Sequence, residues 1–208
     1  MHAIGLSLAI VVAALAVALA LRPWRALRAD GVLQPWLACL VLLPWVWAAQ
    51  RVMPGGVSVQ LSWACLLVLM VGWPLAVLSL LPIAAIGAWL GGIAWPQALD
   101  HLAWNGMMAA TLALSIGLAT RRWLPHHPFV FILGRGFIVT ALAMMAAGTM
   151  SAYVQPPPES TELGSVLLGH WLMAWGEAFS TGMLVAIFVA FKPEWLATWS
   201  DARYLPKD

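Results

Sequence analysis

The sequence has very few charged residues and no stretch that would fold as a separate soluble domain. Only 9% of its residues are charged, whereas 63% are hydrophobic, which is far from the balance of a soluble globular protein. Apolar runs of membrane-spanning length recur from one end to the other. The net charge of +2 lies in loops and gives no indication of a nucleic-acid partner. The composition therefore predicts a protein whose surroundings are the lipid bilayer.

Cysteine is scarce too, and the motifs of several enzyme classes are missing. Cys39 and Cys65 are isolated inside apolar runs and form no CxxC pair. We interpret them as small buried hydrophobes rather than as a disulfide or a thiolate metal site. The sequence has no Walker A motif, so we expect no ATP site in this chain. It also has no HExxH or GxSxG signature, and we do not expect an enzyme.

The apolar runs are continuous rather than alternating, which indicates helices and not the strands of a barrel. We predict an all-α, polytopic membrane protein of about seven transmembrane helices. The tryptophans near the ends of the second helix, Trp36, Trp45 and Trp47, are typical of headgroup depth. Residues 1–191 form the transmembrane domain in this prediction, and residues 192–208 form a polar tail. The predicted spans are 3–21, 32–50, 57–72, 75–95, 101–120, 129–150 and 163–191.

Basic residues fall almost entirely on one side of these spans. Arg51 is the exception, in a loop on the other side, and Arg135 lies within the sixth span. Because cytoplasmic loops are enriched in lysine and arginine, we predict an outside amino terminus and a cytoplasmic carboxyl terminus. The membrane would be the inner membrane of a bacterium. The residues on the predicted inner side are Arg22, Arg25, Arg28, Arg121, Arg122, Lys192, Arg203 and Lys207.

Two ionisable residues lie deep in the predicted spans, where an unpaired charge is costly. Arg135 is about two turns into the sixth span and Glu177 is near the middle of the seventh. An intramembrane ion pair between them would lower the cost of both charges. Two interpretations of such a pair remain open. A structural clamp between helices is favoured over a proton or ion relay.

The first two residues, Met1 and His2, form a candidate metal site. The α-amine, the next backbone nitrogen and the imidazole can chelate one ion. His101 and Asn105 are four residues apart and share one helix face, and Gln60 begins the third span from the same side. Nitrogen and oxygen donors suit a borderline divalent ion such as nickel, cobalt or copper. For each residue alone, a hydrogen bond between helices is the alternative.

Several segments resemble a known family. An amino-terminal Met-His, a short third span after a glycine-rich loop and the segment Asn105-Gly106-Met107 resemble the cobalt/nickel energy-coupling-factor (ECF) permeases of the CbiM/NikM type. These are the substrate-capture proteins of ABC-type uptake systems. Residues 129–132, 176–183, 192–199 and 201–205 are similar to segments of a poorly characterised proteobacterial branch of predicted membrane proteins grouped with them.

The resemblance implies a set of metal ligands. In that family the metal is held by the Met amine, the His2 amide and imidazole nitrogens, and a histidine at the start of the third span. Met1 and His2 match this pattern, whereas Gln60 stands at the third-span position. His101 and His170 are alternatives for the remaining ligand.

The resemblance also implies partners. A transmembrane coupling protein and ATPase subunits would energise uptake of the metal ion. A non-transporting accessory or assembly subunit of a larger membrane complex is the alternative function. The absence of a third-span histidine favours that alternative.

Overall fold

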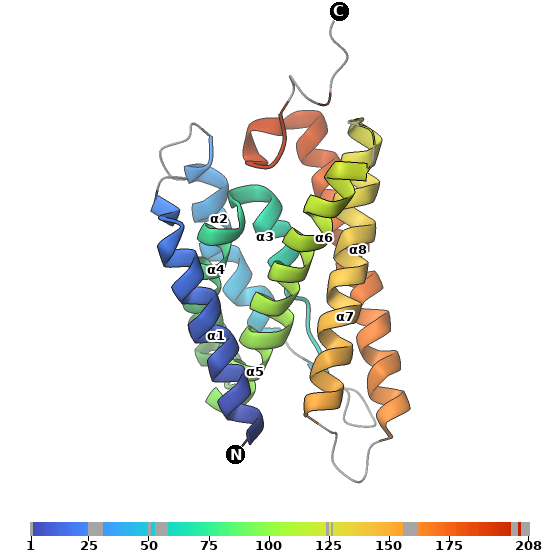
Figure 1. Cartoon of the computed structure of the whole chain (residues 1–208). Helices are drawn as coiled ribbons and strands as arrows, with labels where there is room; N and C mark the ends of the chain where they lie inside the picture. Colours follow the sequence, from blue (N-terminus) through green and yellow to red (C-terminus); the bar gives the residue numbers. More distant parts are fainter. Residues whose placement is uncertain are drawn as a thin grey trace, which may run out of the picture.

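Long helices running between the two ends of a bundle make up the fold (Figure 1). The computed structural model describes residues 2–24, 31–49, 51–52, 58–123, 125, 127–155, 162–200 and 204. The α-helices are α1 (His2–Ala20), α2 (Leu33–Ala48), α3 (Ala64–Val71), α4 (Trp73–Gly91), α5 (Trp95–His101), α6 (Ala109–Trp123), α7 (Val139–Val154) and α8 (Leu163–Phe191). The π-helical stretch η2 (Leu102–Met108) joins α5 to α6, and η3 (Val130–Ile138) leads into α7. A 3-10 turn, η4 (Pro193–Trp195), follows α8.

The predicted all-helical membrane fold is confirmed. Four helical rods are long and apolar enough to cross a membrane, and α1 and α2 are shorter apolar helices. A helix satisfies its own backbone hydrogen bonds, which is what a segment surrounded by lipid requires. The four rods are Trp73–Gly91, Trp95–Trp123, Val130–Val154 and Leu163–Phe191.

The predicted third span, 57–72, is not a continuous helix. Within the described part of this segment, the short strand β2 (Ser58–Val59) pairs antiparallel with β1 (Arg51–Val52). Residues 60–63 form neither helix nor strand, and only the eight residues of α3 are helical. A helix of this length covers roughly 12 Å, less than half of a bilayer core. The segment therefore enters the bundle as irregular chain and completes its path as a half-helix.

The half-helix α3 is the centre of the hydrophobic core. All eight of its residues are buried, and it packs against α2, α4, α6 and α8. A helix that is apolar on every side needs such surroundings. Gly72, with a φ of 80°, turns the chain from α3 directly into α4.

Part of the predicted polar tail covers the end of α3. Leu196 is buried, and the Ala197 N–H donates to the Met70 carbonyl at 3.0 Å. The Thr198 hydroxyl donates to the Leu69 carbonyl at 2.9 Å. These bonds satisfy carbonyls that a helix end leaves without partners, so the chain after α8 contributes to the bundle.

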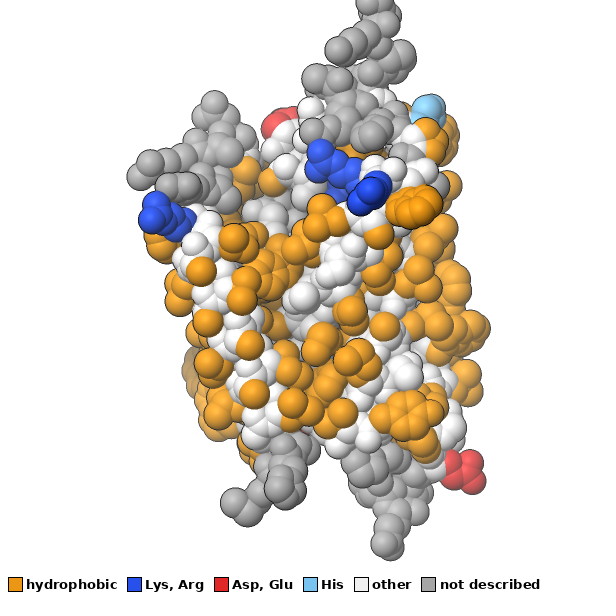
Figure 2. Space-filling model, viewed as in Figure 1, with side chains coloured by type: hydrophobic (Ala, Val, Ile, Leu, Met, Phe, Trp, Pro, Cys, Tyr) orange, Lys and Arg blue, Asp and Glu red, His pale blue; other side chains and the backbone are white. Residues whose placement is uncertain are grey.

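Charge separates the two ends of the bundle. Arg22 follows the end of α1, Arg121 and Arg122 lie in the last turn of α6, and Lys192 follows α8. All of these helix ends lie at the end of the bundle opposite the start of α1 (Figure 1). Figure 2 shows basic side chains at this end above a surface of hydrophobic side chains. The apolar band is the surface that a bilayer would cover.

Candidate functional site

Trp47 of α2 holds the irregular segment before α3, residues 60–63, inside the bundle. The Gln60 side-chain nitrogen donates to the Trp47 carbonyl at 2.7 Å. The Trp47 indole nitrogen donates to the Ser62 carbonyl at 2.9 Å. Irregular backbone at membrane depth is tolerated only where protein groups satisfy it. Trp47 is 2% exposed, so its ring packs inside the bundle and does not face lipid.

Ser62 connects the same segment to the helical rod Trp95–Trp123, which carries His101 and Asn105. Its hydroxyl donates to the Asn105 backbone carbonyl at 2.8 Å. The same oxygen accepts a hydrogen bond from the Ala64 N–H at 3.1 Å. Asn105 lies in the π-helical stretch η2, a feature that occurs frequently at functional sites. Gln60, Trp47 and Asn105 thus belong to one hydrogen-bonded network.

His101 and Asn105 share one face of their rod, as the sequence predicts. The Asn105 Nδ2 and the His101 Nδ1 lie 2.8 Å apart. The His101 ring meets the Trp47 ring nearly edge-on, with 4.6 Å between the ring centroids. The other imidazole nitrogen, Nε2, is buried and has no hydrogen-bond partner.

The Asn105 amide decides which His101 nitrogen can bind a metal ion. When Nδ2 donates to Nδ1, a neutral imidazole carries its proton on Nε2 and offers no lone pair there. When the amide is turned over, Oδ1 accepts a hydrogen bond from Nδ1–H and Nε2 becomes a potential ligand. Asn105 thus lies where its amide can orient the His101 ring.

A small cavity adjoins these residues. Trp47, Gln60, Gln97 and His101 are among the side chains that line it, and its volume is about 10 Å³. This is about the space that one water-sized particle needs. The cavity therefore has room for no more than about one water molecule or ion.

The predicted ligand Met1 lies outside the described residues, and so does the side chain of His2. The backbone of His2 begins α1, which packs against α5 and η2. The Gln155 side chain donates to the Ser7 hydroxyl at 3.3 Å and links α1 to the end of α7. The chain therefore starts at the same end of the bundle as α5, the helix of His101 (Figure 1).

His170, the other alternative ligand, lies on α8. A side chain added at Gly148 of α7 would meet the His170 ring at 2.9 Å, so the two helices cross closely there. The His170 Nδ1 is buried without a hydrogen-bond partner. Within the described residues, no three His, Cys, Asp or Glu side chains come together as a metal-binding group.

Glu177 does not pair with Arg135, contrary to the prediction. Among the described side chains, the ion pair is between Lys192 and Glu194, two exposed residues that follow α8. The Glu177 carboxylate instead accepts a hydrogen bond from the Ser62 N–H at 2.8 Å, and the Trp63 N–H also reaches it. These N–H groups belong to the two residues before α3, and the first N–H of α3 itself, that of Ala64, donates to the Ser62 hydroxyl. Glu177 therefore caps the backbone that leads into α3 from inside the bundle.

The chain is strained where Glu177 caps it. Trp63 has a φ of 50°, in the left-handed region, which is unfavourable for a bulky residue. Its indole nitrogen donates to the Ser180 hydroxyl at 3.0 Å. The break before α3 is thus held from α8 by both Glu177 and Ser180.

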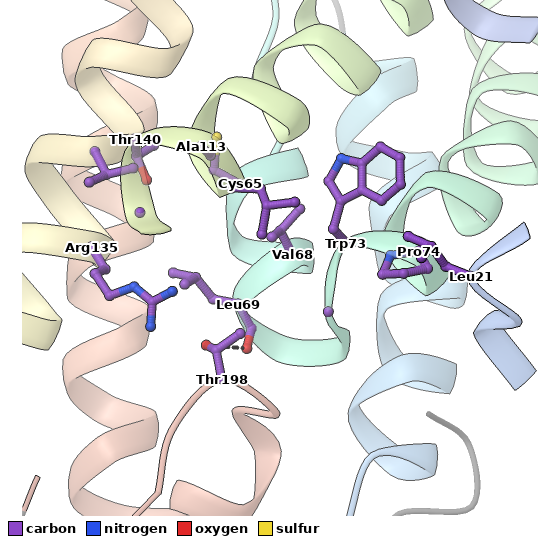
Figure 3. A pocket seen from close by; sticks show the side chains of 14 residues that line it. Leu21, Cys65, Val68, Leu69, Trp73, Pro74, Ala113, Arg135, Thr140 and Thr198 are labelled. Atoms are coloured by element: carbon purple, nitrogen blue, oxygen red, sulfur yellow. Dashed lines mark hydrogen bonds between the residues drawn. The ribbon is translucent and has the colours of Figure 1, made fainter. Parts of the chain in front are cut away.

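Arg135 lies in η3 and lines a separate cavity of about 190 Å³ (Figure 3). Its guanidinium carbon lies 5.5 Å from the centroid of the Phe131 ring. Its Nε is buried and has no hydrogen-bond partner. Cys65 lines the same cavity. Both Cys65 and Cys39 are buried free thiols, as the sequence predicts.

These features define a class: a polytopic helical membrane protein with one broken span, whose break is bonded to a polar network beside an ion-sized cavity. The chain belongs to the family described as the cobalt uptake substrate-specific transmembrane region, CbiM, whose model matches residues 2–195. The predicted resemblance is therefore confirmed. No curated protein and no solved structure matches the chain. Members of this family are components of metal-uptake systems and multi-pass membrane proteins, in the inner membrane in bacteria.

Three contributors to the network are absent from the predicted site: Trp47, Ser62 and the capping role of Glu177. One signal was available, because a serine just before an apolar run is typical of a helix start. Ser62 lies two residues before Ala64, where α3 begins. The roles of Trp47 and Glu177 depend on which helices become neighbours, and no local pattern reports that.

Proposed function

We propose that this protein captures a divalent transition metal ion of the cobalt or nickel type. The observation that carries the proposal is the network that brings Gln60, His101 and Asn105 together around Trp47. This network borders an ion-sized cavity and lies at the end of the bundle where α1 begins (Figure 1). Membership of a cobalt-uptake family supports it independently.

Met1 and His2 would supply most of the ligands. The resemblance to the family implies that the α-amine, the His2 amide and the His2 imidazole bind the ion. The His101 Nε2, which has no partner in the described network, is the best further donor. The Gln60 nitrogen is already bonded to the Trp47 carbonyl, which leaves only its amide oxygen. A nitrogen-rich set favours nickel, cobalt or copper over magnesium or calcium.

The energy for uptake would come from other subunits. The chain has no Walker A motif, so ATP hydrolysis would belong to partner ATPases. A transmembrane coupling protein would connect them to this subunit, as in the ECF systems that the chain resembles. The capture site then faces outside, because the basic end of the bundle belongs in the cytoplasm.

Metal binding by the purified full-length protein tests the proposal. Adding one alanine before Met1 moves the amine away from His2 and should weaken cobalt or nickel binding at least tenfold, which is about 1.4 kcal/mol. His127, an exposed histidine beyond the end of α6, provides the control, since His127→Gln should leave binding unchanged. Equal affinity with and without the extra alanine would reject the amino-terminal chelate.

A non-transporting accessory or assembly subunit is the second candidate function. It is favoured by Gln60, which stands where the resemblance places a histidine and whose nitrogen is bonded to Trp47. On this alternative the wild-type protein binds no cobalt, nickel or copper and co-purifies with a larger membrane complex. Neighbouring genes for an ATPase pair would favour transport, and genes for a respiratory complex would favour assembly.

A further inference from the structure

The Arg135 cavity lies near the basic end of the bundle, away from the candidate metal site. Its lining includes Leu21 and Gly72, which directly follow α1 and α3, and Thr198, which is bonded to the Leu69 carbonyl of α3. We propose that this cavity binds the phosphate-bearing head of an anionic phospholipid. The proposal is independent of metal capture.

The charge of Arg135 has no counter-ion among the described residues. Its Nε is buried without a hydrogen-bond partner, and Glu177, the acidic residue deep in the neighbouring helix, is bonded to the Ser62 N–H. An arginine at membrane depth is costly unless an anion or water neutralises it. An anion from outside the chain would supply the negative charge that the described side chains do not place beside Arg135.

A second polar group faces the same space. Thr140 is fully buried, lines the cavity, and its hydroxyl has no hydrogen-bond partner. In Figure 3 the Arg135 guanidinium extends into the cavity, and Thr140 lies on the same side of it. A forked cation and a nearby hydroxyl are a suitable donor set for phosphate oxygens.

The rest of the lining is apolar and suits a lipid better than a free ion. Val68, Leu69, Trp73 and Pro74 form much of the wall. Leu21, which also lines the cavity, is 57% exposed, so the space reaches the surface of the bundle. At about 190 Å³ it is much larger than the ion-sized cavity beside His101. An acyl chain can leave at Leu21 and continue in the bilayer.

The neighbouring charges favour an anionic over a zwitterionic lipid. Arg121 and Arg135 together line a smaller adjacent cavity, and Arg122 and Arg22 lie at the same end of the bundle. Basic clusters at a membrane surface attract anionic headgroups. Phosphatidylglycerol, which carries one net negative charge at its phosphate, has the required chemistry.

Retention of lipid by the purified protein tests the proposal. The full-length protein is delipidated in detergent and incubated with phosphatidylglycerol, with phosphatidylcholine or with inorganic phosphate, and bound lipid is counted by native mass spectrometry. Arg135→Met should reduce retention of phosphatidylglycerol roughly tenfold, the effect of losing a charge-assisted bond to phosphate. Lys192→Gln, an exposed basic residue at the same end that lines neither cavity, is the control and should retain the lipid.

A second variant keeps the test decisive if Arg135→Met does not fold. Ala113→Phe retains the arginine and fills the cavity that Ala113 lines, so it should also exclude the lipid. Equal retention of the two lipids by the wild type, or full retention of phosphatidylglycerol by either cavity variant, would overturn the proposal. Equal thermal stabilisation by inorganic phosphate would identify a phosphate site and reject the lipid. Metal binding should not change in either variant, which separates this test from that of the proposed function.

Discussion

Single polar residues inside this bundle are bonded to backbone groups as well as to one another. Glu177 binds the Ser62 N–H just before α3, Gln60 binds the Trp47 carbonyl, and Ser62 binds the Asn105 carbonyl. The physical reason is the break before α3, which leaves peptide groups at membrane depth without helical partners. At this scale the network predicts which substitutions lower the stability of the protein and which weaken only the proposed metal binding.

Replacing Glu177 should show that its partner is the backbone. Glu177→Leu leaves the Ser62 N–H buried without an acceptor and should cost about 1–3 kcal/mol of stability. Glu177→Gln keeps an oxygen acceptor and should cost less. Thermal unfolding in detergent measures both changes.

The absence of an ion pair gives a second, independent expectation for Glu177. The losses of unfolding free energy caused by Glu177→Leu and by Arg135→Leu should add to within ~0.5 kcal/mol in the double variant. If Arg135→Leu instead rescued most of the loss caused by Glu177→Leu, the two charges would be coupled and the capping role would be wrong.

Substitutions of Asn105 should separate a positioning role from a direct ligand. Asn105→Leu removes the partner of the His101 Nδ1 and should weaken metal binding ~10–100-fold. Asn105→Asp can only accept from Nδ1–H, which leaves Nε2 free, so it should preserve binding. Isothermal titration with cobalt and nickel measures both variants. Loss of binding in Asn105→Asp but not in Asn105→Leu would contradict the role assigned to Asn105.

At the scale of elements, α3 is the unusual part of the fold. It is a half-helix preceded by backbone that Glu177 of α8 caps, and its end is bonded to Ala197 and Thr198. Discontinuous helices of this kind place helix ends and their partial charges within a bundle. The position of Gln60, and with it one side of the candidate metal site, depends on how α3 is held.

Packing around α3 should therefore matter more than packing on the lipid-facing helices. Leu67 on α3 is 0% exposed, whereas Leu118 on α6 is 52% exposed. Leu67→Ala should destabilise the protein by about 2–5 kcal/mol, the range for a buried large-to-small change. Leu118→Ala should have little effect on unfolding in the same detergent. Equal losses in the two variants would mean that α3 is not the core of the bundle.

At the scale of the whole molecule, charge and hydrophobicity define an axis. The described basic residues Arg22, Arg121, Arg122 and Lys192 lie at one end, and an apolar band separates them from the end where α1 begins (Figure 2). This arrangement agrees with the count of basic residues along the sequence. The orientation of the axis in the membrane is a prediction.

Reporter fusions test that orientation. Because lysine and arginine are retained on the cytoplasmic side, a reporter fused after Asp208 should be active only as a cytoplasmic reporter. A fusion within the loop between α7 and α8 should report the opposite side and serves as the control. A periplasmic signal after Asp208 would reverse the axis and place Met1 in the cytoplasm.

Composition and the positions of the apolar runs were sufficient to predict the class, the helical rods and the side on which the basic residues gather. They were sufficient because these features are local: each run must satisfy its own backbone in lipid, and each charge must lie near water. The pairing of His101 with Asn105 was predictable for the same reason, since both lie on one helix.

Only the tertiary structure decided the partners of Gln60, Ser62, Trp47 and Glu177. Each of these residues is bonded to a group that is distant in sequence, and such neighbours follow from how the helices pack. The break in the third span was decided in the same way, because an apolar run can be irregular where surrounding protein satisfies its backbone. The sequence therefore determined that polar residues would lie among the apolar helices, and the packing of α2, α8 and η2 around α3 determined their connections.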